Sequence, residues 1–224
     1  MSWMFGPPDI RACLEATEII DSTHPTITVC ALSLSLLSPK ERARHLFCFV
    51  RDEIAYEFLP RLEREEYRAS RVLAAGKGFC VQKAILLCAL GRAAGIPTAL
   101  VLSDLRDATL PEALVRALGT DTLYHHGLSA FYLDGRWLLA DASLPRALCE
   151  RRGYRPVRFD GAADAMIAPT TLAGSPHAIY EKIHGAYSEF PFEQMVRAFR
   201  EGYARADPTA LEHLGYHVPL EWSR

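Results

Sequence analysis

The feature that most restricts the fold of this chain is a pair of apolar runs separated by Asp134 and Gly135. The stretch HHGLSAFYLDGRWLLADAS, residues 125–143, is rich in aromatic and aliphatic residues on both sides of that dipeptide. Asp-Gly between two such runs is a strong signal for a two-residue β-hairpin. In that turn Leu133 pairs with Arg136, which fixes the register of both strands. The sequence therefore predicts an antiparallel hairpin with one defined register.

This register brings a histidine and an aspartate to the same face of the hairpin. Residues opposite one another share a face, as do residues two apart on one strand. His126 and Asp141 become diagonal neighbours with Cβ atoms about 5–8 Å apart, whereas His125 points to the opposite face. Asp141 lies within the apolar run WLLADAS, where a buried carboxylate is costly unless it is paired. We therefore expect His126 to be its partner.

A cysteine stands at the start of the most apolar helical pattern in the chain. In GKGFCVQKAILLCALGRAAGIP, Gly76 and Gly78 form a turn, and a helix is predicted over about 80–94. Cys80 falls in the first turn of that helix, where about half a positive charge favours a thiolate over a thiol. Cys88, two turns further on, is typical of a buried core residue.

Cys80, His126 and Asp141 together have the order and types of a nucleophilic triad. A histidine tied to a carboxylate is held in one tautomer and becomes a better base for a neighbouring thiol. The predicted roles are nucleophile for Cys80, base for His126 and orienting carboxylate for Asp141. Each residue alone also has an ordinary explanation: a small buried cysteine, a singly hydrogen-bonded histidine, and a turn aspartate. The chemistry requires no metal and no organic cofactor.

Composition excludes several other classes of function. The chain has 224 residues, 50% of them hydrophobic, and a net charge of −2, so it lacks the basic surface typical of nucleic-acid or membrane binding. Its six cysteines form no CxxC pair, which favours reduced thiols in a cytoplasmic protein. The first residues show no signal-peptide pattern, and no run is long enough to span a bilayer.

On both sides of the cysteine helix, local signals predict further elements. Ser38 and Glu41 form a capping box ahead of a helix over 40–54, and 98–105 has the pattern of a strand. A helix is expected over 9–20. Ser70 is the predicted cap of a short helix.

The sequence predicts mainly loop and helix in the C-terminal third, with helices near 176–187 and 191–205. Its aromatic residues Phe159, Tyr180 and Tyr187 are expected to roof a substrate cleft. Two pairs of histidines are further candidates for functional groups, but the sequence favours exposed, polar positions for them. These are His213 with His217, four apart but without a third metal ligand nearby, and His177 with His184.

The two motif regions resemble the transglutaminase-like domain of the papain-related thiol enzymes, in its bacterial form. The likeness lies in the glycine turn before Cys80, the helix exit Arg92–Pro97, His126 opening one strand and Asp141 closing the next. It implies an α+β fold in which the nucleophile helix packs on an antiparallel sheet, with helical N- and C-terminal extensions. One domain over 1–224 is expected, with a core over about 24–145 and an extension over 146–224.

The resemblance implies thiol-dependent acyl transfer or hydrolysis at an amide or thioester carbonyl, through an acyl-enzyme. Animal transglutaminases have Gln-Cys-Trp where this chain has Phe79-Cys80-Val81, and Gly127-Leu128 follows the histidine. These departures favour a hydrolase, amidase or peptidase over a protein cross-linking enzyme. Two alternatives remain: a non-catalytic domain that binds a peptide or protein, and a redox or regulatory thiol. The expected partner is a peptide, protein or small acyl or amide substrate.

Overall fold

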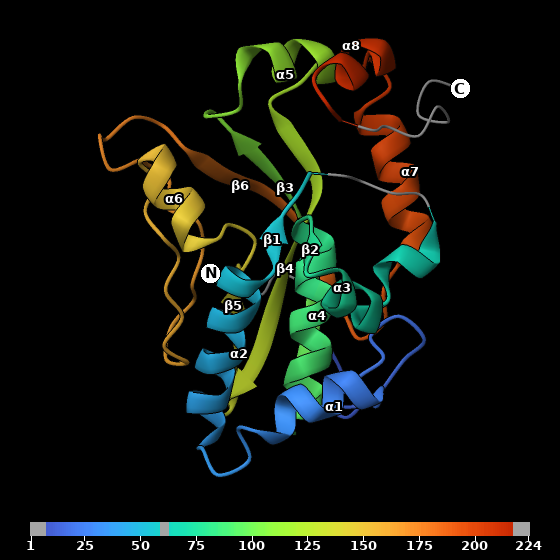
Figure 1. Ribbon diagram of the computed structural model, residues 1–224, viewed down its shortest axis with the longest axis vertical. Coiled ribbons are helices and arrows are strands. Elements are labelled where there is room, and N and C mark those ends of the chain that lie inside the picture. Colours follow the sequence, from blue (N-terminus) through green and yellow to red (C-terminus); the bar gives the residue numbers. More distant parts are fainter. Residues whose placement is uncertain (1–7, 59–62, 217–224) are drawn as a thin grey trace.

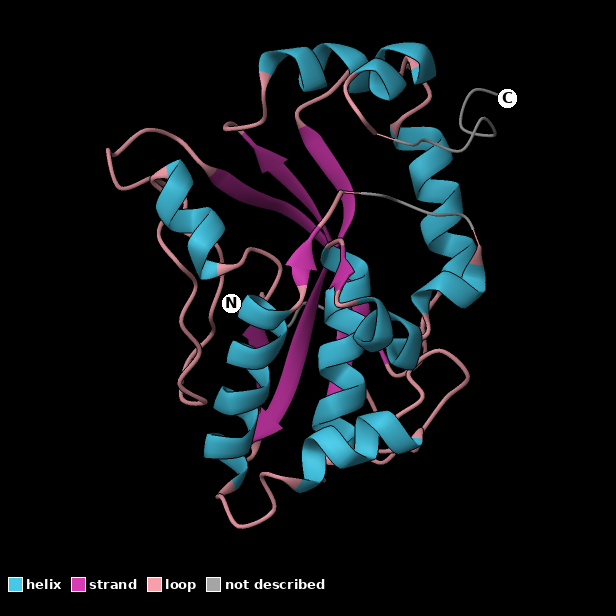
Figure 2. Cartoon of the chain, viewed as in Figure 1, coloured by secondary structure: helices cyan, strands magenta, loops and turns pink. Residues whose placement is uncertain are grey.

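The computed structural model describes residues 8–58 and 63–216 and has an α+β architecture (Figures 1 and 2). His217, considered above together with His213, lies outside these ranges. The helices are α1 (Pro25–Leu32), α2 (Pro39–Glu53), α3 (Ala69–Ala75), α4 (Cys80–Ala93), α5 (Glu112–Leu118), α6 (Arg146–Arg152), α7 (Phe192–Gly202) and α8 (Pro208–His213), with a 3₁₀ turn at Arg64–Tyr67. The strands are β1 (Ala55–Tyr56), β2 (Lys77–Gly78), β3 (Thr98–Asp107), β4 (Thr122–Leu133), β5 (Arg136–Ala140) and β6 (Ala178–Tyr187).

The central sheet has four strands in the order β5-β4-β3-β6, and every neighbouring pair is antiparallel. The predicted hairpin is confirmed, because β4 and β5 pair with Leu133 opposite Arg136. Asp134 and Gly135 have φ values of 48° and 78° in the turn between them. Two successive left-handed residues are what a two-residue turn needs to match the twist of its strands.

Helix α4 forms the centre of the core in front of this sheet (Figure 1). Its residues from Cys80 to Arg92 are all buried, because β3 and β4 pack on one side and α1, α2 and α3 on the others. A helix that is apolar on every side must be enclosed in this way. At Gly91 a methyl group would lie 2.4 Å from the Thr98 side chain, so this glycine allows α4 to approach β3 closely.

Helix α2 begins as the sequence predicts. The hydroxyl of Ser38 accepts from the backbone N–H of Glu41, and the Glu41 carboxylate accepts from the backbone N–H of Ser38. At the other end of the helix, the buried Lys83 of α4 donates to the carbonyls of Arg51 and Ile54. These bonds fix the exit of α2, from which β1 follows directly.

Two N-terminal predictions are wrong. Residues 10–14 form turns instead of a helix. The carbonyl of Cys13 accepts from the backbone N–H of Thr98, so this segment is held at the start of β3 by a bond that helix formation would disrupt. Ser70 lies inside α3 and its hydroxyl donates to Asp21, whereas Arg68 occupies the cap position.

The predicted helix over 176–187 is also wrong, because residues Ala178–Tyr187 form the edge strand β6 of the central sheet. The strand is extended because it pairs with β3 along its length, from Asp107 opposite Ala178 to Leu100 opposite Tyr187. This part of the chain is therefore a component of the sheet, not a helical or loop extension. The next predicted helix is present as α7.

None of the helices in the described ranges combines the length and the apolar character that crossing a lipid bilayer requires.

Candidate active site

Cys80 occupies the first position of α4, immediately after a short parallel pairing of β1 with β2. Tyr56 of β1 lies opposite Gly78 of β2, two residues before the cysteine. The helix start is braced by Gln82, whose side-chain oxygen accepts from the backbone N–H of Phe79 at 3.2 Å. Cys80 is 5% exposed. The thiol is thus held at a helix N-terminus inside the protein, as the sequence predicts.

Gly127 brings strand β4 against this helix start. A methyl group on Gly127 would lie 2.5 Å from the Cα of Val81 and 3.2 Å from the carbonyl oxygen of Cys80. Real side chains do not tolerate contacts this close with backbone, so only glycine fits here. Because His126 precedes Gly127, this close approach places its ring beside the cysteine.

The predicted contact between His126 and Asp141 is present. Nε2 of His126 lies 2.6 Å from Oδ2 of Asp141, which follows directly after the last residue of β5. The other ring nitrogen, Nδ1, is buried without a hydrogen-bond partner among the described residues, so it is the position open to the Cys80 thiol. Burial alone would lower the pKa of His126, but the charge of Asp141 and the thiol of Cys80 outweigh it and raise this pKa to about 10.

Asp141 is fully buried yet has its oxygens satisfied. Oδ1 accepts from the backbone N–H of Ser143 at 3.0 Å and from its hydroxyl at 2.5 Å. Oδ2 accepts from the hydroxyl of Tyr180 at 2.6 Å in addition to His126. Burial would raise the pKa of Asp141, but the charge of His126 and these hydrogen bonds lower it to about 2. The carboxylate is therefore ionised and held in one orientation.

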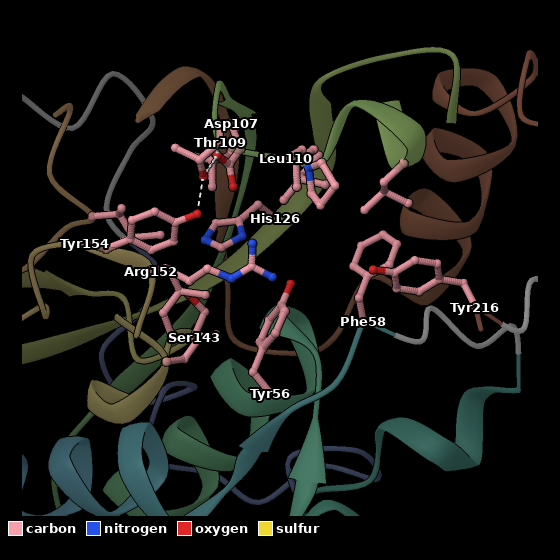
Figure 3. A pocket seen from close by; sticks show the side chains of 17 residues that line it. Tyr56, Phe58, Asp107, Thr109, Leu110, His126, Ser143, Arg152, Tyr154 and Tyr216 are labelled. Carbon is pink, nitrogen blue, oxygen red and sulfur yellow. Dashed lines mark hydrogen bonds between the residues drawn. The ribbon is translucent and has the colours of Figure 1, made fainter. Parts of the chain in front are cut away.

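A cavity of about 320 Å³ opens beside His126 (Figure 3). Its wall is largely apolar, with a polar corner where Tyr154 donates to Thr109 at 2.8 Å and Thr109 donates to the carboxylate of Asp107 at 2.6 Å. Arg152 also lines the cavity. The lining residues from the 146–224 part of the chain are Leu148, Arg152, Tyr154, Ile167 and Tyr216. Phe159, Tyr180 and Tyr187 do not line it, so the predicted roof is wrong.

The three aromatic residues predicted as a roof have other positions. Phe159 is core, stacked on Phe131 with ring centroids 5.4 Å apart. Tyr180 bonds to Asp141, and the hydroxyl of Tyr187 accepts from the Gln194 side chain at 2.8 Å.

Two of the histidines that were predicted to be exposed, His177 and His184, are not exposed. His177 is buried and packs on the ring of Tyr154 with centroids 4.2 Å apart. His184 is half-buried beside Asp104.

The sequence does not predict the roles that three residues have in this site. Ser143 stands two residues after Asp141, and this Asp-x-Ser spacing is a recognisable signal for a side-chain turn. Tyr180 and Tyr56 arrive from distant strands without a local signal. Tyr56 lines the cavity together with His126. Burial raises the pKa of Tyr56 well above its ordinary value, and negative charge at Cys80 raises it further, so its hydroxyl stays protonated.

Helix α4 begins with a buried cysteine and packs on an antiparallel sheet, next to a hydrogen-bonded histidine and aspartate. This architecture is of the kind found in thiol enzymes. The model for the Transglutaminase-like superfamily matches residues 31–142, half of the chain, and includes Cys80, His126 and Asp141. The chain belongs to the transglutaminase-like superfamily.

Two solved structures are similar to this chain. A provisionally assigned cysteine protease from Cytophaga hutchinsonii has 18% identity and a TM-score of 0.47, covering 80% of this chain and 55% of its own. A provisionally assigned protease from Parabacteroides distasonis has 15% identity and a TM-score of 0.39, covering 70% of this chain and 29% of its own. This chain thus spans about half the length of the first and less of the second. No curated protein gives a significant match to the sequence.

Proposed function

We propose that this protein is a cysteine hydrolase or acyltransferase that cleaves an amide or thioester through an acyl-enzyme on Cys80. The observation that carries this proposal is the arrangement around His126. Its Nε2 is bonded to the buried Asp141, and its Nδ1 is left for a thiol at the start of α4. A histidine oriented by a carboxylate and placed beside a cysteine is the arrangement that nucleophilic catalysis requires.

The reaction would proceed in two balanced halves. The Cys80 thiolate forms a C–S bond to the carbonyl carbon, and collapse of the intermediate breaks the C–N or C–S bond to the leaving group. His126 gives its proton to that group. Water then attacks the thioester while His126 takes its proton, which releases the acid and restores the thiolate. Asp141 keeps the imidazole oriented in both halves.

The negative oxygen formed in each half needs two hydrogen-bond donors. The backbone N–H of Cys80, at the first turn of α4, is one. We assign the second to the hydroxyl of Tyr56, because it lines the cavity with His126 and stays protonated. Loss of one such donor typically reduces kcat about 100- to 1000-fold.

The cavity indicates the kind of substrate. Leu105, Leu110 and Leu114 form part of an apolar wall, and Arg152 contributes a guanidinium. The carboxylate of Asp107 also lines the cavity but accepts from the backbone N–H and the hydroxyl of Thr109, which leaves the guanidinium for a ligand. We infer an acyl group or side chain that is mainly apolar and carries an anionic group near one end. The Phe79-Cys80-Val81 sequence and Gly127 favour water over a protein amine as the acceptor.

One observation favours the alternative of a non-catalytic binding domain. Cys80 does not line the cavity and is 5% exposed, so a ligand that fills the cavity does not by itself contact the sulfur. A binding domain would use the cavity alone and leave the thiol unused.

A trapping experiment distinguishes the two functions. The protein is incubated with a panel of thioesters and activated amides of apolar, anionic acyl groups, and the mass of the Cys80 peptide is measured. An enzyme gives acylated Cys80 in wild type, none in Cys80→Ser, and a rate at least about 100-fold lower in Tyr56→Phe. Saturable binding of the same compounds without acylation in any variant would support the binding domain and contradict the enzyme.

A further inference from the structure

A second cluster of reactive side chains lies on the sheet, outside the groups used above. Asp104 of β3, His125 of β4 and His184 of β6 come from three adjacent strands and offer ligand atoms that all lie within 4.8 Å of one another. Among the described residues, these three form the group of histidine and carboxylate side chains whose ligand atoms are close enough together to hold a metal ion. Two imidazoles and one carboxylate are a common ligand set for divalent transition metals.

All three residues stand where the sheet departs from regular pairing. The register between β3 and β4 shifts around Asp104, between Ser103 and Leu105. The register between β3 and β6 shifts twice in the same region, which leaves His184 outside the ladder. β-Bulges re-aim side chains and are frequent beside functional sites. Here the bulges turn an aspartate and two histidines from different strands toward one point.

The backbone N–H of His125 donates to Oδ1 of Asp104 at 3.2 Å, but one of its ring nitrogens has no such bond. Its φ is 51°, a left-handed conformation that costs a non-glycine residue free energy. Its side chain is 5% exposed, and Nδ1 is buried without a hydrogen-bond partner among the described residues, 3.9 Å from Oδ1 of Asp104. Buried polar atoms are nearly always paired, so an unpaired nitrogen directed at a carboxylate indicates a missing ligand.

The distances suit a metal ion after small side-chain rotations. Nε2 of His184 is 2.8 Å from Oδ1 of Asp104, and the two imidazole rings lie with their centroids 4.1 Å apart. Donors around a tetrahedral zinc ion are about 3.3 Å apart, given metal–nitrogen bonds of about 2.0–2.1 Å. His184 and Asp104 are 14% and 16% exposed, so an ion has access from solvent and keeps a position for water.

Gln194 of α7 provides an outer partner of the kind that metal-bound histidines use. Its side-chain nitrogen lies 3.4 Å from Nε2 of His125. If the side-chain amide of Gln194 is rotated by about 180°, so that its oxygen and nitrogen exchange places, the oxygen accepts from Nε2–H of His125. Nδ1 of His125 is then free to bind the ion. Such outer hydrogen bonds fix the tautomer of the ligand.

We propose that Asp104, His125 and His184 form a binding site for a divalent transition-metal ion, with zinc as the best-matched metal. The ion would hold β3, β4 and β6 together at their bulges and stabilise the strained backbone of His125. It takes no part in the acyl-transfer chemistry, for which the sequence predicted no metal, and the proposal does not depend on that chemistry.

Calorimetric titration with zinc of the chelator-treated protein tests the site. The Cys80→Ala variant is titrated in parallel, because a thiol beside His126 can itself bind zinc. We expect one equivalent of zinc to bind in both proteins, and affinity to fall at least about 100-fold in His184→Ala and Asp104→Asn. His213→Ala, a change of an exposed histidine on α8, is the matched control and should leave affinity unchanged. Equal affinity in all variants, or no stoichiometric binding, would overturn the proposal.

X-ray absorption of the zinc-loaded wild type keeps the test independent of whether the variants fold. Two imidazoles and oxygen around the metal, without sulfur, are the expected ligands. A sulfur ligand, or a single imidazole, would place the ion elsewhere and refute the assignment.

Discussion

At the scale of single residues, the site depends on a carboxylate with no exposed surface. Asp141 remains ionised there because four hydrogen-bond donors, two from Ser143 and one each from His126 and Tyr180, replace the water it has lost. A buried charge without such partners would be costly enough to prevent its ionisation. Because Ser143 and Tyr180 hold the carboxylate in place, the carboxylate in turn fixes the orientation of His126. The stability of the fold and the chemistry of the site therefore depend on the same contacts.

The lowered pKa of Asp141 predicts how the stability of the protein changes in acid. Its folded value of about 2 lies below the ordinary aspartate value of about 3.9, so the folded state binds fewer protons than the unfolded state. The stabilisation is fully present above about pH 5 and is lost as pH falls through about 3.9 toward 2, an effect of about 2–3 kcal/mol. Urea unfolding at several pH values should show this loss in wild type and a flatter profile in Asp141→Asn. Parallel profiles for the two proteins would contradict the proposed ionised state.

At the scale of elements, the site forms where a strand meets the first turn of a helix. Gly127 permits that meeting, because its backbone packs directly on Val81 and Cys80. The glycine therefore determines how close His126 comes to the thiol, although it has no chemistry of its own.

Gly127→Ala should separate β4 from α4. The added methyl group meets backbone atoms that cannot move aside, so we expect a loss of stability of about 3 kcal/mol and slower alkylation of Cys80. Gly174→Ala is the matched control: it has φ of 83° but no atom within 4 Å, so it should cost about 1–2 kcal/mol and leave Cys80 unchanged. Chemical denaturation and iodoacetamide labelling provide the two readouts. Unaltered labelling in a folded Gly127→Ala protein would show that this contact does not position the site.

The elements that the sequence predicts correctly are those whose signals are local. The turn at Asp134-Gly135, the capping box at Ser38 and the apolar pattern of α4 each lie within a few consecutive residues. β6 has no comparable signal, because its extended form depends on pairing with β3, about 80 residues earlier in the chain. The hairpin placed His126 and Asp141 together for the same local reason, whereas Tyr56 and Tyr180 join the site only through the tertiary fold.

At the scale of the whole molecule, Arg92 connects segments from both ends of the chain. Its guanidinium, buried at the end of α4, donates to the carbonyls of Glu15, Thr98 and Ser188 at 2.7–3.3 Å. The N-terminal segment, the start of β3 and the chain after β6 are thus fixed to one helix. The sequence identified Arg92 only as part of a motif, because its partners are distant in sequence.

Arg92→Met should therefore destabilise the whole fold. The change leaves three carbonyls without their charged donor, and we expect a loss of at least about 3 kcal/mol in the free energy of unfolding. Arg116→Met removes an exposed ion pair with Glu112 and should cost less than about 1 kcal/mol. Thermal or urea unfolding compares the two variants. Similar small losses in both would mean that the buried arginine does not link these segments.

The central claim is that Cys80 is activated by His126, and its alkylation rate tests that claim most directly. Iodoacetamide labelling at pH 6 is followed by mass spectrometry of the Cys80 peptide, with the half-buried Cys30 of the same molecule as internal reference. We predict that Cys80 reacts at least about tenfold faster than Cys30, despite its lower exposure, and loses this advantage in His126→Ala. Equal and slow labelling of Cys80 in both proteins would contradict the account.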